Sequence, residues 1–303
     1  MDNVKNWFQN YKFLKPIGSG GMGIVYLAYA IDFSREVVVK QLMSKSNDPY
    51  ENSEAIRLFK REAKILSKLN HPGIVPILDY HASSDGKYFL VMDYIKGKDL
   101  SVVLKNFGAF DSEAVVEIGI QCCQVLSYIH LQVPAIIYRD LKPSNLILTP
   151  EGRVVFIDFG IARIVNFNQA ATKVVTSGYS PPEQYYGKPE PRSDLYALGV
   201  TLGHLLTGIK PKPLTQSNPL KDNKTINLHL NDLIFRLTNY NIDDRPATAQ
   251  VVMLELKEIF KEIKGYQRQT QTSIPGLVLE ASQSPEPLTL WQKIADWIKK
   301  RQK

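Results

Sequence analysis

Hydrophobic and polar residues alternate through the first third of the chain. Residues 11–42 are rich in β-branched and aromatic side chains, with a glycine cluster between two such runs. This pattern predicts a β-hairpin followed by a third strand over 36–42. Apolar residues then recur at helical spacing over 54–69, and two more strands are predicted near 74–80 and 87–93.

From Leu100 onward the spacing of apolar residues becomes mostly helical. The clearest helical stretches are 112–131, 194–207, 229–239 and 247–263. A mostly β first third and a mostly α remainder predict two lobes, with a hinge near Asp93–Gly97.

The last part of the chain changes character twice. Residues 265–287 are rich in Gln, Thr, Ser and Pro, which predicts a flexible linker. Residues 288–303 then predict a basic amphipathic helix, with Leu, Ile and Trp on one face and lysines on the other. This helix fits two roles, docking on the protein body or a second copy, or lying on a membrane surface.

Composition and charge narrow the class of protein. The 303 residues are 44% hydrophobic, contain no apolar run long enough to span a bilayer, and begin without a signal-peptide pattern. The only cysteines, Cys122 and Cys123, are adjacent in an apolar helical pattern, which fits a reducing, cytoplasmic setting. About half of the net charge of +7 lies in the last eleven residues, with no zinc-ligand spacing elsewhere, so nucleic acid is not an expected partner.

The segment around residue 140 carries the most specific chemistry. Asp140, Lys142 and Asn145 lie within six residues, and Asp158 follows in Asp-Phe-Gly. Phosphoryl transfer needs a carboxylate that orients a hydroxyl, a cation near the phosphoryl group, and hard oxygen ligands for Mg²⁺. These four residues match that requirement in kind and in order.

The same segment resembles the catalytic and metal-binding loops of the eukaryotic-like (Hanks-type) Ser/Thr protein kinases, with bacterial members most similar. Tyr138 stands where His is commoner in the family. The resemblance implies an α+β bilobal fold with a small, mainly antiparallel β N-lobe, one key helix and a larger, mainly α C-lobe. It also implies ATP with Mg²⁺, or Mn²⁺, as cofactors. The expected boundaries are an N-terminal extension over 1–10, the N-lobe over 11–95 and the C-lobe over 96–264.

The glycine cluster fits this resemblance. Gly18, Gly20, Gly23 and Val25 have the GxGxxGxV form, in which backbone amides approach phosphates and the valine contacts a base. A purely structural turn would give the same glycines. The position between two predicted strands favours the kinase hairpin over a dinucleotide-binding turn.

The resemblance assigns further nucleotide contacts. Lys40 lies at the end of an apolar strand and would pair with Glu62 on the following helix. In this position it would hold the α- and β-phosphates. The simpler alternative is that both side chains point to solvent. Val38 replaces the usual Ala, which would narrow the adenine slot. The other residues implied in the adenine and ribose pocket are Met92, Asp93, Ile95, Asp99 and Ile147.

In the catalytic loop, Asp140 would act as the base, and Asn145 and Asp158 would hold the metal. Lys142 is typical of the Ser/Thr-specific branch. The activation-loop phosphosites implied are Thr172 and Thr176, and Thr176 would also contact Asp140 and Lys142.

Four residues have implied structural roles. Asp194 would brace the catalytic-loop backbone, Arg245 would pair with Glu183, and Arg139 would receive the phosphate of the activation loop.

Three functions are therefore compared. An active Ser/Thr protein kinase that phosphorylates itself and protein partners fits best, because no catalytic group is missing. A pseudokinase or scaffold predicts the loss of such a group, and a small-molecule kinase predicts no Gly-Tyr-x-x-Pro-Glu ending, which this chain has. The expected partners are protein substrates, a second copy of the chain, and an inner membrane surface through the 288–303 helix.

Overall fold

The computed structural model describes residues 7, 9–20, 23–43, 49–83, 87–159, 176–272, 292 and 294. The chain divides into two compact units. We call residues 1–96 with 155–174 the sheet unit, and residues 97–154 with 175–303 the helical unit. The α+β class expected from the sequence is confirmed, with an antiparallel sheet in one unit and mostly helices in the other.

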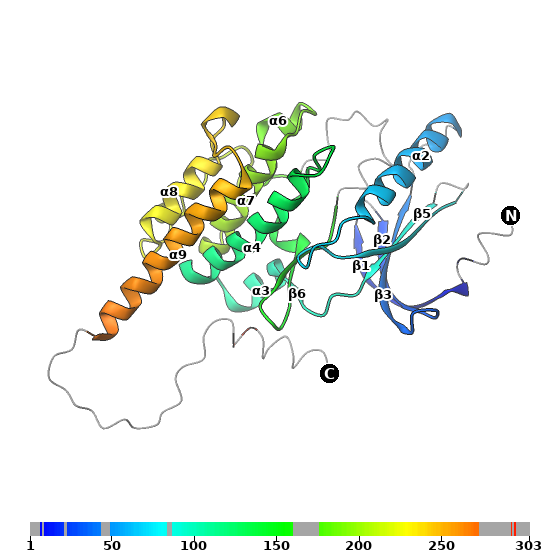
Figure 1. Cartoon of the computed structure of the whole chain (residues 1–303), viewed down its shortest axis with the longest axis horizontal. Helices are drawn as coiled ribbons and strands as arrows, with labels where there is room; N and C mark the ends of the chain where they lie inside the picture. The colour runs from blue at the N-terminus through cyan, green and yellow to red at the C-terminus, as the bar shows by residue number, and fades with distance from the viewer. Residues whose placement is uncertain are drawn as a thin grey trace, which may run out of the picture. The chain divides into compact units, whose positions relative to one another are not determined.

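The sheet unit is built on five antiparallel strands in the order β1-β2-β3-β5-β4 (Figure 1). The elements are β1 (Tyr11–Gly20), β2 (Gly23–Ala30), β3 (Arg35–Met43), α2 (Pro49–Leu66), β4 (Ile77–Ala82) and β5 (Lys87–Asp93). The predicted strands and helix are all present, with β4 beginning three residues later than expected.

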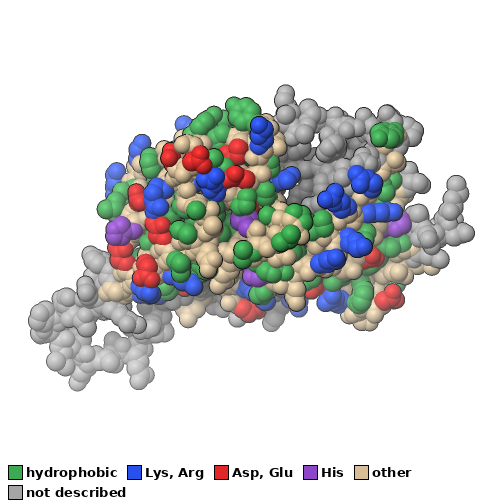
Figure 2. All heavy atoms as spheres, turned by 45° about the horizontal axis from the view of Figure 1, so that its top comes forward, with side chains coloured by type: hydrophobic (Ala, Val, Ile, Leu, Met, Phe, Trp, Pro, Cys, Tyr) green, Lys and Arg blue, Asp and Glu red, His purple; other side chains and the backbone are tan. Residues whose placement is uncertain are grey.

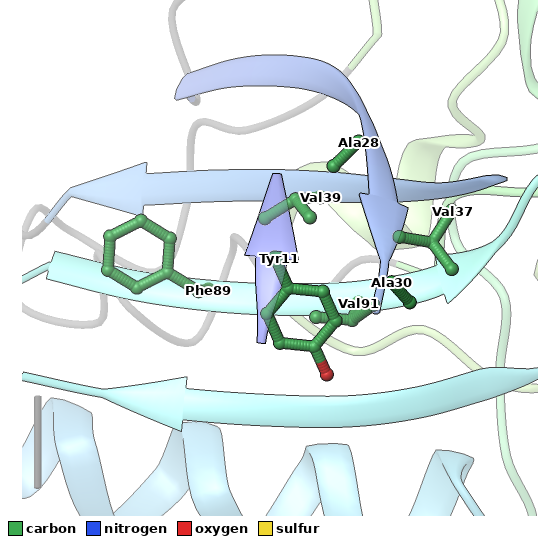
Figure 3. Close-up of a cluster of buried hydrophobic side chains, with 7 residues drawn as sticks. All are labelled: Tyr11, Ala28, Ala30, Val37, Val39, Phe89 and Val91. Carbon is green, nitrogen blue, oxygen red and sulfur yellow. The ribbon is translucent and has the colours of Figure 1, made fainter. Parts of the chain in front are cut away.

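One face of this sheet carries a hydrophobic cluster that joins its strands. Figure 3 shows its members, which lie at alternate positions on their strands: Tyr11, Ala28, Ala30, Val37, Val39, Phe89 and Val91. Trp7 packs against the cluster, and its indole Nε1 donates to Asp79 Oδ2 at 2.7 Å. Tyr11 Oη donates to the same oxygen at 2.9 Å. Because Tyr11 is on β1 and Asp79 is on β4, these bonds link the two edge strands.

Helix α2 packs on the opposite face of the sheet. Its buried residues Phe59, Ala63 and Leu66 form one stripe, and the Phe59 ring lies 5.1 Å from that of Tyr88 on β5. Figure 2 shows several Lys and Arg side chains on the surface of the sheet unit. The exposed basic residues of α2 are Arg57, Lys60, Arg61 and Lys64. The helix is therefore amphipathic, with its cations in water.

The helical unit contains α3 (Leu100–Phe107), α4 (Ser112–His130), α6 (Pro182–Tyr185), α7 (Pro191–Thr207), α8 (Leu228–Leu237) and α9 (Ala249–Thr272). Its short elements are β6 (Lys98–Asp99), β7 (Leu146–Leu148), η1 (Pro143–Asn145), η2 (Pro219–Lys221) and η3 (Ile242–Asp244). β8 (Val154–Phe156) spans the boundary between the units. In Figure 1, α4 and α9 run side by side and α7 packs against α4 and α8.

Helix α7 is the centre of this unit. It is buried almost without interruption from Ser193 to Leu206, and Gly208 ends it in a left-handed conformation with φ 70°. Cys122 and Cys123 of α4 are also fully buried, as their apolar sequence context predicts. Burial raises the pKa of both thiols well above the usual range, so they remain protonated packing residues.

The boundary of the sheet unit differs from the sequence prediction in one respect. Residues 155–159 were expected in the C-lobe, but they group with the sheet unit. Phe156 N donates to Gly73 O at 2.9 Å, and Val75 N donates to Phe156 O at 3.0 Å. These two backbone bonds attach the segment to residues that precede β4, which a reading along the chain does not reveal.

The C-terminal part also differs. The flexible linker was predicted to begin at residue 265, but α9 continues to Thr272. The residues from Gly265 onward include Gln and Arg, which favour helix, and no proline interrupts them before that point. The remainder of the predicted linker lies outside the described residues.

Two residues of the predicted tail helix are described. Gln292 is exposed, and Ile294 is only 1% exposed. Within the described part of the chain, no helix is both long and apolar enough to cross a membrane.

Candidate active site

The helical unit holds four of the predicted residues in one hydrogen-bonded cluster around Asp140. Thr176 Oγ1 donates to Asp140 Oδ1 at 2.6 Å. Lys142 Nζ donates to Asp140 Oδ1 at 3.1 Å, to Asp140 Oδ2 at 3.0 Å and to Thr176 Oγ1 at 3.1 Å. Asn145 Nδ2 donates to Asp140 Oδ2 at 2.8 Å and to the Asp140 carbonyl at 2.9 Å. The contacts expected of Thr176 are therefore present, and the carboxylate is fixed by three side chains.

The backbone that presents Asp140 is held by a buried carboxylate. Asp194, which is 0% exposed, accepts hydrogen bonds from the amides of Tyr138 and Arg139, both at 2.8 Å. Arg139 has a φ of 67°, a conformation unfavourable for a non-glycine residue. Gln184 Nε2 donates to the Arg139 carbonyl at 3.0 Å. These bonds hold the strained residue in place while its side chain remains exposed.

The predicted pair of Glu183 and Arg245 is also present. Arg245 donates from Nη1 to Glu183 Oε1 at 2.8 Å and from Nη2 to Oε2 at 3.1 Å, and its guanidinium lies 4.9 Å from the Tyr196 ring. Ser193 Oγ donates to the same Oε1 at 2.6 Å. Burial acts to raise the pKa of Glu183, but the hydrogen bonds from Arg245 and Ser193 outweigh it, so the pKa lies below its usual value.

In the sheet unit, Lys40 is paired with Asp158. Lys40 Nζ lies 2.6 Å from Asp158 Oδ1 and 2.7 Å from Oδ2, and its side chain is 11% exposed. The partner expected for Lys40 was Glu62, which falls within the bounds of α2 but whose side chain is outside the described part of the structure. The sequence analysis did not anticipate the contact with Asp158.

The strand register places Lys40 among other predicted nucleotide-binding residues. Val25 on β2 lies opposite Lys40, and Gly18 on β1 lies opposite Val25. Val38 lies opposite Met92 on β5. Directly opposed residues of an antiparallel sheet project to the same face, and so do residues two apart on one strand. Val25, Val38, Lys40 and Met92 therefore share the face on which α2 packs.

The glycines of the hairpin have different environments. Gly20 pairs with Gly23 at the end of the hairpin. Gly23 has a φ of 141°, and a Cβ there would lie 1.8 Å from the Gln41 carbonyl, so the close approach of β3 alone requires glycine. A Cβ at Gly18 would meet only Val25, at 3.8 Å or more, so the backbone there is more open.

The last residue of β5 and the residues that follow it have local structural contacts. The Asp93 amide donates a hydrogen bond to Pro76 O at 3.0 Å, and the Asp93 carboxylate pairs with Arg35 at 3.5 Å. Ile95 is partly buried.

In the helical unit, Asp99 caps α3. Its Oδ1 accepts from the Val102 amide at 3.0 Å and from Ser101 Oγ. Ile147 lies opposite Asp99 in the β6–β7 pair. Asp99, which was predicted to contact the ribose, thus caps the N-terminus of α3. The sequence pattern Asp-Leu-Ser-Val also indicates this cap.

The donor set fits a magnesium ion. Because Asn145 uses Nδ2 for both of its bonds to Asp140, its Oδ1 is the atom left for a cation. In the sheet unit, Asp158 has carboxylate oxygens, the same hard type of ligand, and one of them pairs with Lys40 at 2.6 Å. The described residues contain no group of three or more His, Cys, Asp or Glu side chains suited to a metal. Magnesium usually takes one or two carboxylates together with substrate phosphates, so it does not require such a group.

Thr172, the other predicted phosphosite, lies outside the described residues. Sequence reasoning missed Gln184 and Ser193 as supports of this site. The motif Pro-Pro-Glu-Gln could have indicated Gln184, because this residue directly follows Glu183.

Comparisons with known proteins agree with this geometry. The family model described as protein kinase domain matches residues 11–276. A probable serine/threonine-protein kinase of Clostridium perfringens is 34% identical over 269 residues, which are 83% of this chain and 38% of the relative. The chain spans half or less of the length of the first curated relatives that it matches.

Solved structures show the same similarity. The kinase domain of PknI from Mycobacterium tuberculosis has a TM-score of 0.66 at 26% identity, covering 82% of this chain and 96% of that domain. A structure of Rad53 residues 1–466 in complex with AMP-PNP has a TM-score of 0.65 at 25% identity, covering 82% of this chain and 65% of that one. The family match begins at β1 and ends beyond α9, and the chain therefore belongs to the protein kinase domain family, among its bacterial serine/threonine members.

Proposed function

We propose that this chain transfers the γ-phosphoryl group of ATP to serine and threonine hydroxyls of proteins, including those of its own activation loop. The observation that carries this proposal is the contact of Thr176 with Asp140. A threonine hydroxyl donates to the carboxylate at 2.6 Å while Lys142 contacts the hydroxyl oxygen at 3.1 Å. A substrate hydroxyl needs the same two partners, an acceptor for its proton and a cation beside its oxygen.

ATP and Mg²⁺ would supply the transferable phosphoryl group and the charge that neutralises its phosphates. Lys40 would be the cation beside the α- and β-phosphates, and Asn145 and Asp158 would be the metal ligands. Gly18, Gly20 and Gly23 would lie near the phosphates, and Val25, Val38 and Met92 would contact the base. Support for a nucleotide comes from the Rad53 neighbour, whose title names the ATP analogue AMP-PNP.

The protein's own contribution is positioning. Asp140 accepts the proton of the attacking hydroxyl, and Asn145 and Lys142 keep both carboxylate oxygens oriented. Asp194 and Gln184 hold the backbone directly before Asp140, at the amide and the carbonyl of Arg139. General-base assistance of this kind contributes about 10²–10⁴-fold to a rate.

Autophosphorylation would occur at Thr172 or Thr176. A phosphate adds nearly two negative charges and three acceptor oxygens. The Arg139 side chain is exposed next to Asp140 and can pair with such a group. A phosphate on Thr176 would replace the hydroxyl that now contacts Asp140, so this site would alter the cluster directly.

The tail helix at 288–303 is better suited to docking than to a membrane surface. Ile294 belongs to its predicted apolar face and is 1% exposed, which requires protein atoms around it. Docking on the same chain accounts for this burial, because the structure contains a single copy; docking on a second copy stays an alternative. Binding of the chain to anionic vesicles, weakened by salt, would instead favour the membrane surface.

The test of the proposed function is incubation of the purified chain with ATP and Mg²⁺, beside an Asp140→Asn control, followed by phosphosite mapping with mass spectrometry. We expect phosphate on Thr172 or Thr176 that is absent from the control. No phosphate in either sample, even with Mn²⁺ and a generic protein substrate, would overturn the proposal in favour of a pseudokinase or scaffold. Repeating the assay on residues 1–272 shows whether the tail inhibits transfer.

A further inference from the structure

A pocket of about 410 Å³ lies in the helical unit, beside the C-terminal half of α7. Val200, Gly203, His204 and Thr207 of α7 contribute to its lining, and the rest comes from residues 209–222, which follow that helix. None of the residues given a catalytic, metal-binding or nucleotide-binding role above lines it.

The loop that forms the pocket wall is fixed by several contacts. A Cβ at Gly203 would lie 2.2 Å from Ser217 Oγ, so the loop packs directly on the helix backbone. Ser217 N donates to Thr238 Oγ1 at 2.9 Å, and Gln216 Nε2 donates to the Phe235 carbonyl at 2.9 Å. The pocket is therefore formed in advance of any ligand, which lowers the entropy cost of binding.

The lining of the pocket is basic. Lys210, Lys212 and Lys221 are exposed, and none of them forms an ion pair with any residue that the structure describes. Asp222 is the single carboxylate in the lining. Burial lowers the pKa of His204, and the charge of Lys210 lowers it further, so the imidazole is neutral at pH 7. The net local charge is positive, and it arises from the three lysines.

The pocket is connected to the catalytic cluster through the chain that follows Thr176. Tyr179 Oη lies 2.6 Å from His204 Nδ1, and a Cβ at Gly178 would lie 2.6 Å from the Pro211 carbonyl. Three residues of extended chain span at most about 11 Å, which bounds the distance from Thr176 to Tyr179. Because Thr176 contacts Asp140, the pocket lies within a few residues' reach of an acceptor hydroxyl at that carboxylate.

We propose that this pocket binds an acidic side chain of the protein substrate, a carboxylate or a phosphate, within about three residues of the phosphorylated position. The inference rests on the proposed kinase activity and specifies its substrate class. A peptide fits better than a free anion, because Ile209, Pro211 and Pro219 offer apolar surface next to the lysines. The lysines come from both ends of the loop and would contact such a side chain from two directions.

The first test compares peptide substrates that share one threonine acceptor with neutral flanks. A Glu or a phosphoserine is placed in turn at each of the three positions on either side, and kcat/KM is measured. We expect an increase of about tenfold for Glu on one side, since each exposed charge pair contributes modestly. Phosphoserine should give the larger increase, because it carries nearly two charges. Equal increases for both groups would still identify an anion site, and Glu without effect beside a responsive phosphoserine would restrict it to phosphate.

The second arm uses the triple variant Lys210→Gln, Lys212→Gln, Lys221→Gln. The ratio of acidic to neutral kcat/KM should fall to near one. A matched control, Lys105→Gln, Lys224→Gln, Lys257→Gln, removes the same charge from exposed positions of this unit outside the pocket and should keep the ratio. A ratio of one at all positions in the unchanged protein, or an equal loss in the control, would overturn the proposal.

A binding measurement separates this proposal from the kinase activity itself. Labelled peptides with alanine at the acceptor position are titrated with the chain and followed by fluorescence anisotropy. We expect the acidic peptide to bind about tenfold more tightly than its neutral counterpart, and the triple lysine variant to remove the difference. Equal affinities would reject the pocket even if transfer is observed. A difference in affinity would support the pocket even if no peptide is phosphorylated.

Discussion

Two ion pairs of this protein differ in how many of their polar atoms are already hydrogen-bonded and in how exposed they are to water. Arg245 of the Glu183 pair is fully buried, with a side chain that is 0% exposed, and its five guanidinium N–H groups match five hydrogen bonds. Lys40 of the Asp158 pair is 11% exposed, and Asp158 is 31% exposed. The first pair is closed to other partners, whereas the second keeps contact with water.

This difference separates a structural pair from one that can exchange partners. A planar guanidinium whose donors are all occupied cannot release one bond without leaving a buried donor unsatisfied. An ammonium is a rotatable point charge, so Lys40 can transfer from a carboxylate to a phosphate at low cost. A nucleotide site needs an ion pair that can exchange partners, as that of Lys40 and Asp158 can. The structural support of the catalytic loop needs a pair that stays closed, as that of Glu183 and Arg245 does.

The largest expected effect is that of Arg245→Ala on stability. Removing one partner from a buried pair leaves Glu183 without compensation, which costs about 3–5 kcal/mol. The free energy of unfolding in urea measures this loss. Arg236→Ala is the matched control, because its pairs with Asp232 and Glu255 are partly exposed and should contribute at most about 1 kcal/mol. Similar losses in both variants would contradict the comparison.

Lys40→Met should instead reduce activity strongly and stability only slightly. We expect kcat/KM for phosphoryl transfer to fall by about 10²-fold or more, since a preorganised cation near the phosphates is lost. The free energy of unfolding should change by less than about 1 kcal/mol, because Asp158 remains accessible to water. A loss of stability comparable to that of Arg245→Ala would show that the Lys40 pair is also structural.

Acid should weaken the Glu183 pair. The pKa of this carboxyl is lowered in the folded chain from its usual value near 4.5, so the unfolded chain binds protons more readily. Its contribution to stability is therefore complete above that usual value and is lost as the pH falls through the lowered one. In urea titrations from neutral pH downward, the difference between the unchanged protein and Glu183→Gln should shrink below pH 4.5. A constant difference would exclude this ionisation as the source.

Ser193→Ala should affect stability alone, and by less than Arg245→Ala. The hydroxyl donates to Glu183 Oε1 at 2.6 Å and accepts from the Glu190 amide at 3.0 Å, at the start of α7. Losing both bonds should cost about 1–2 kcal/mol in the free energy of unfolding, with activity retained. A neutral result would mean that Arg245 alone is sufficient to hold Glu183.

The sequence predicted the contacts that depend on short, specific motifs. The resemblance to the kinases implied the contacts of Thr176 with Asp140 and Lys142 and the pair of Glu183 and Arg245, and the structure contains both. The strands of the sheet unit were also predicted, because alternation follows directly when one face of a strand is buried and the other is in water.

Other features could not be predicted because they depend on contacts between distant residues. The attachment of Phe156 beside Gly73 and Val75 rests on backbone bonds, which leave no side-chain pattern. Gly23 was predicted as a phosphate-loop residue, and its positive φ and the nearby Gln41 carbonyl add a requirement of the strand pair that the sequence does not reveal. The pocket beside α7 combines residues from a helix and a loop whose fold only the structure reveals.

The two adjacent cysteines of α4 have a practical consequence for chemical labelling. Cys122 and Cys123 are 0% exposed, and burial keeps their thiols protonated, so alkylating reagents at neutral pH should not reach them in the folded protein. A cysteine introduced at an exposed position, such as Lys212 in the pocket wall, would then be the reactive thiol among the described residues. The natural chain is thus ready for attachment of a single fluorophore or spin label without prior removal of its own cysteines.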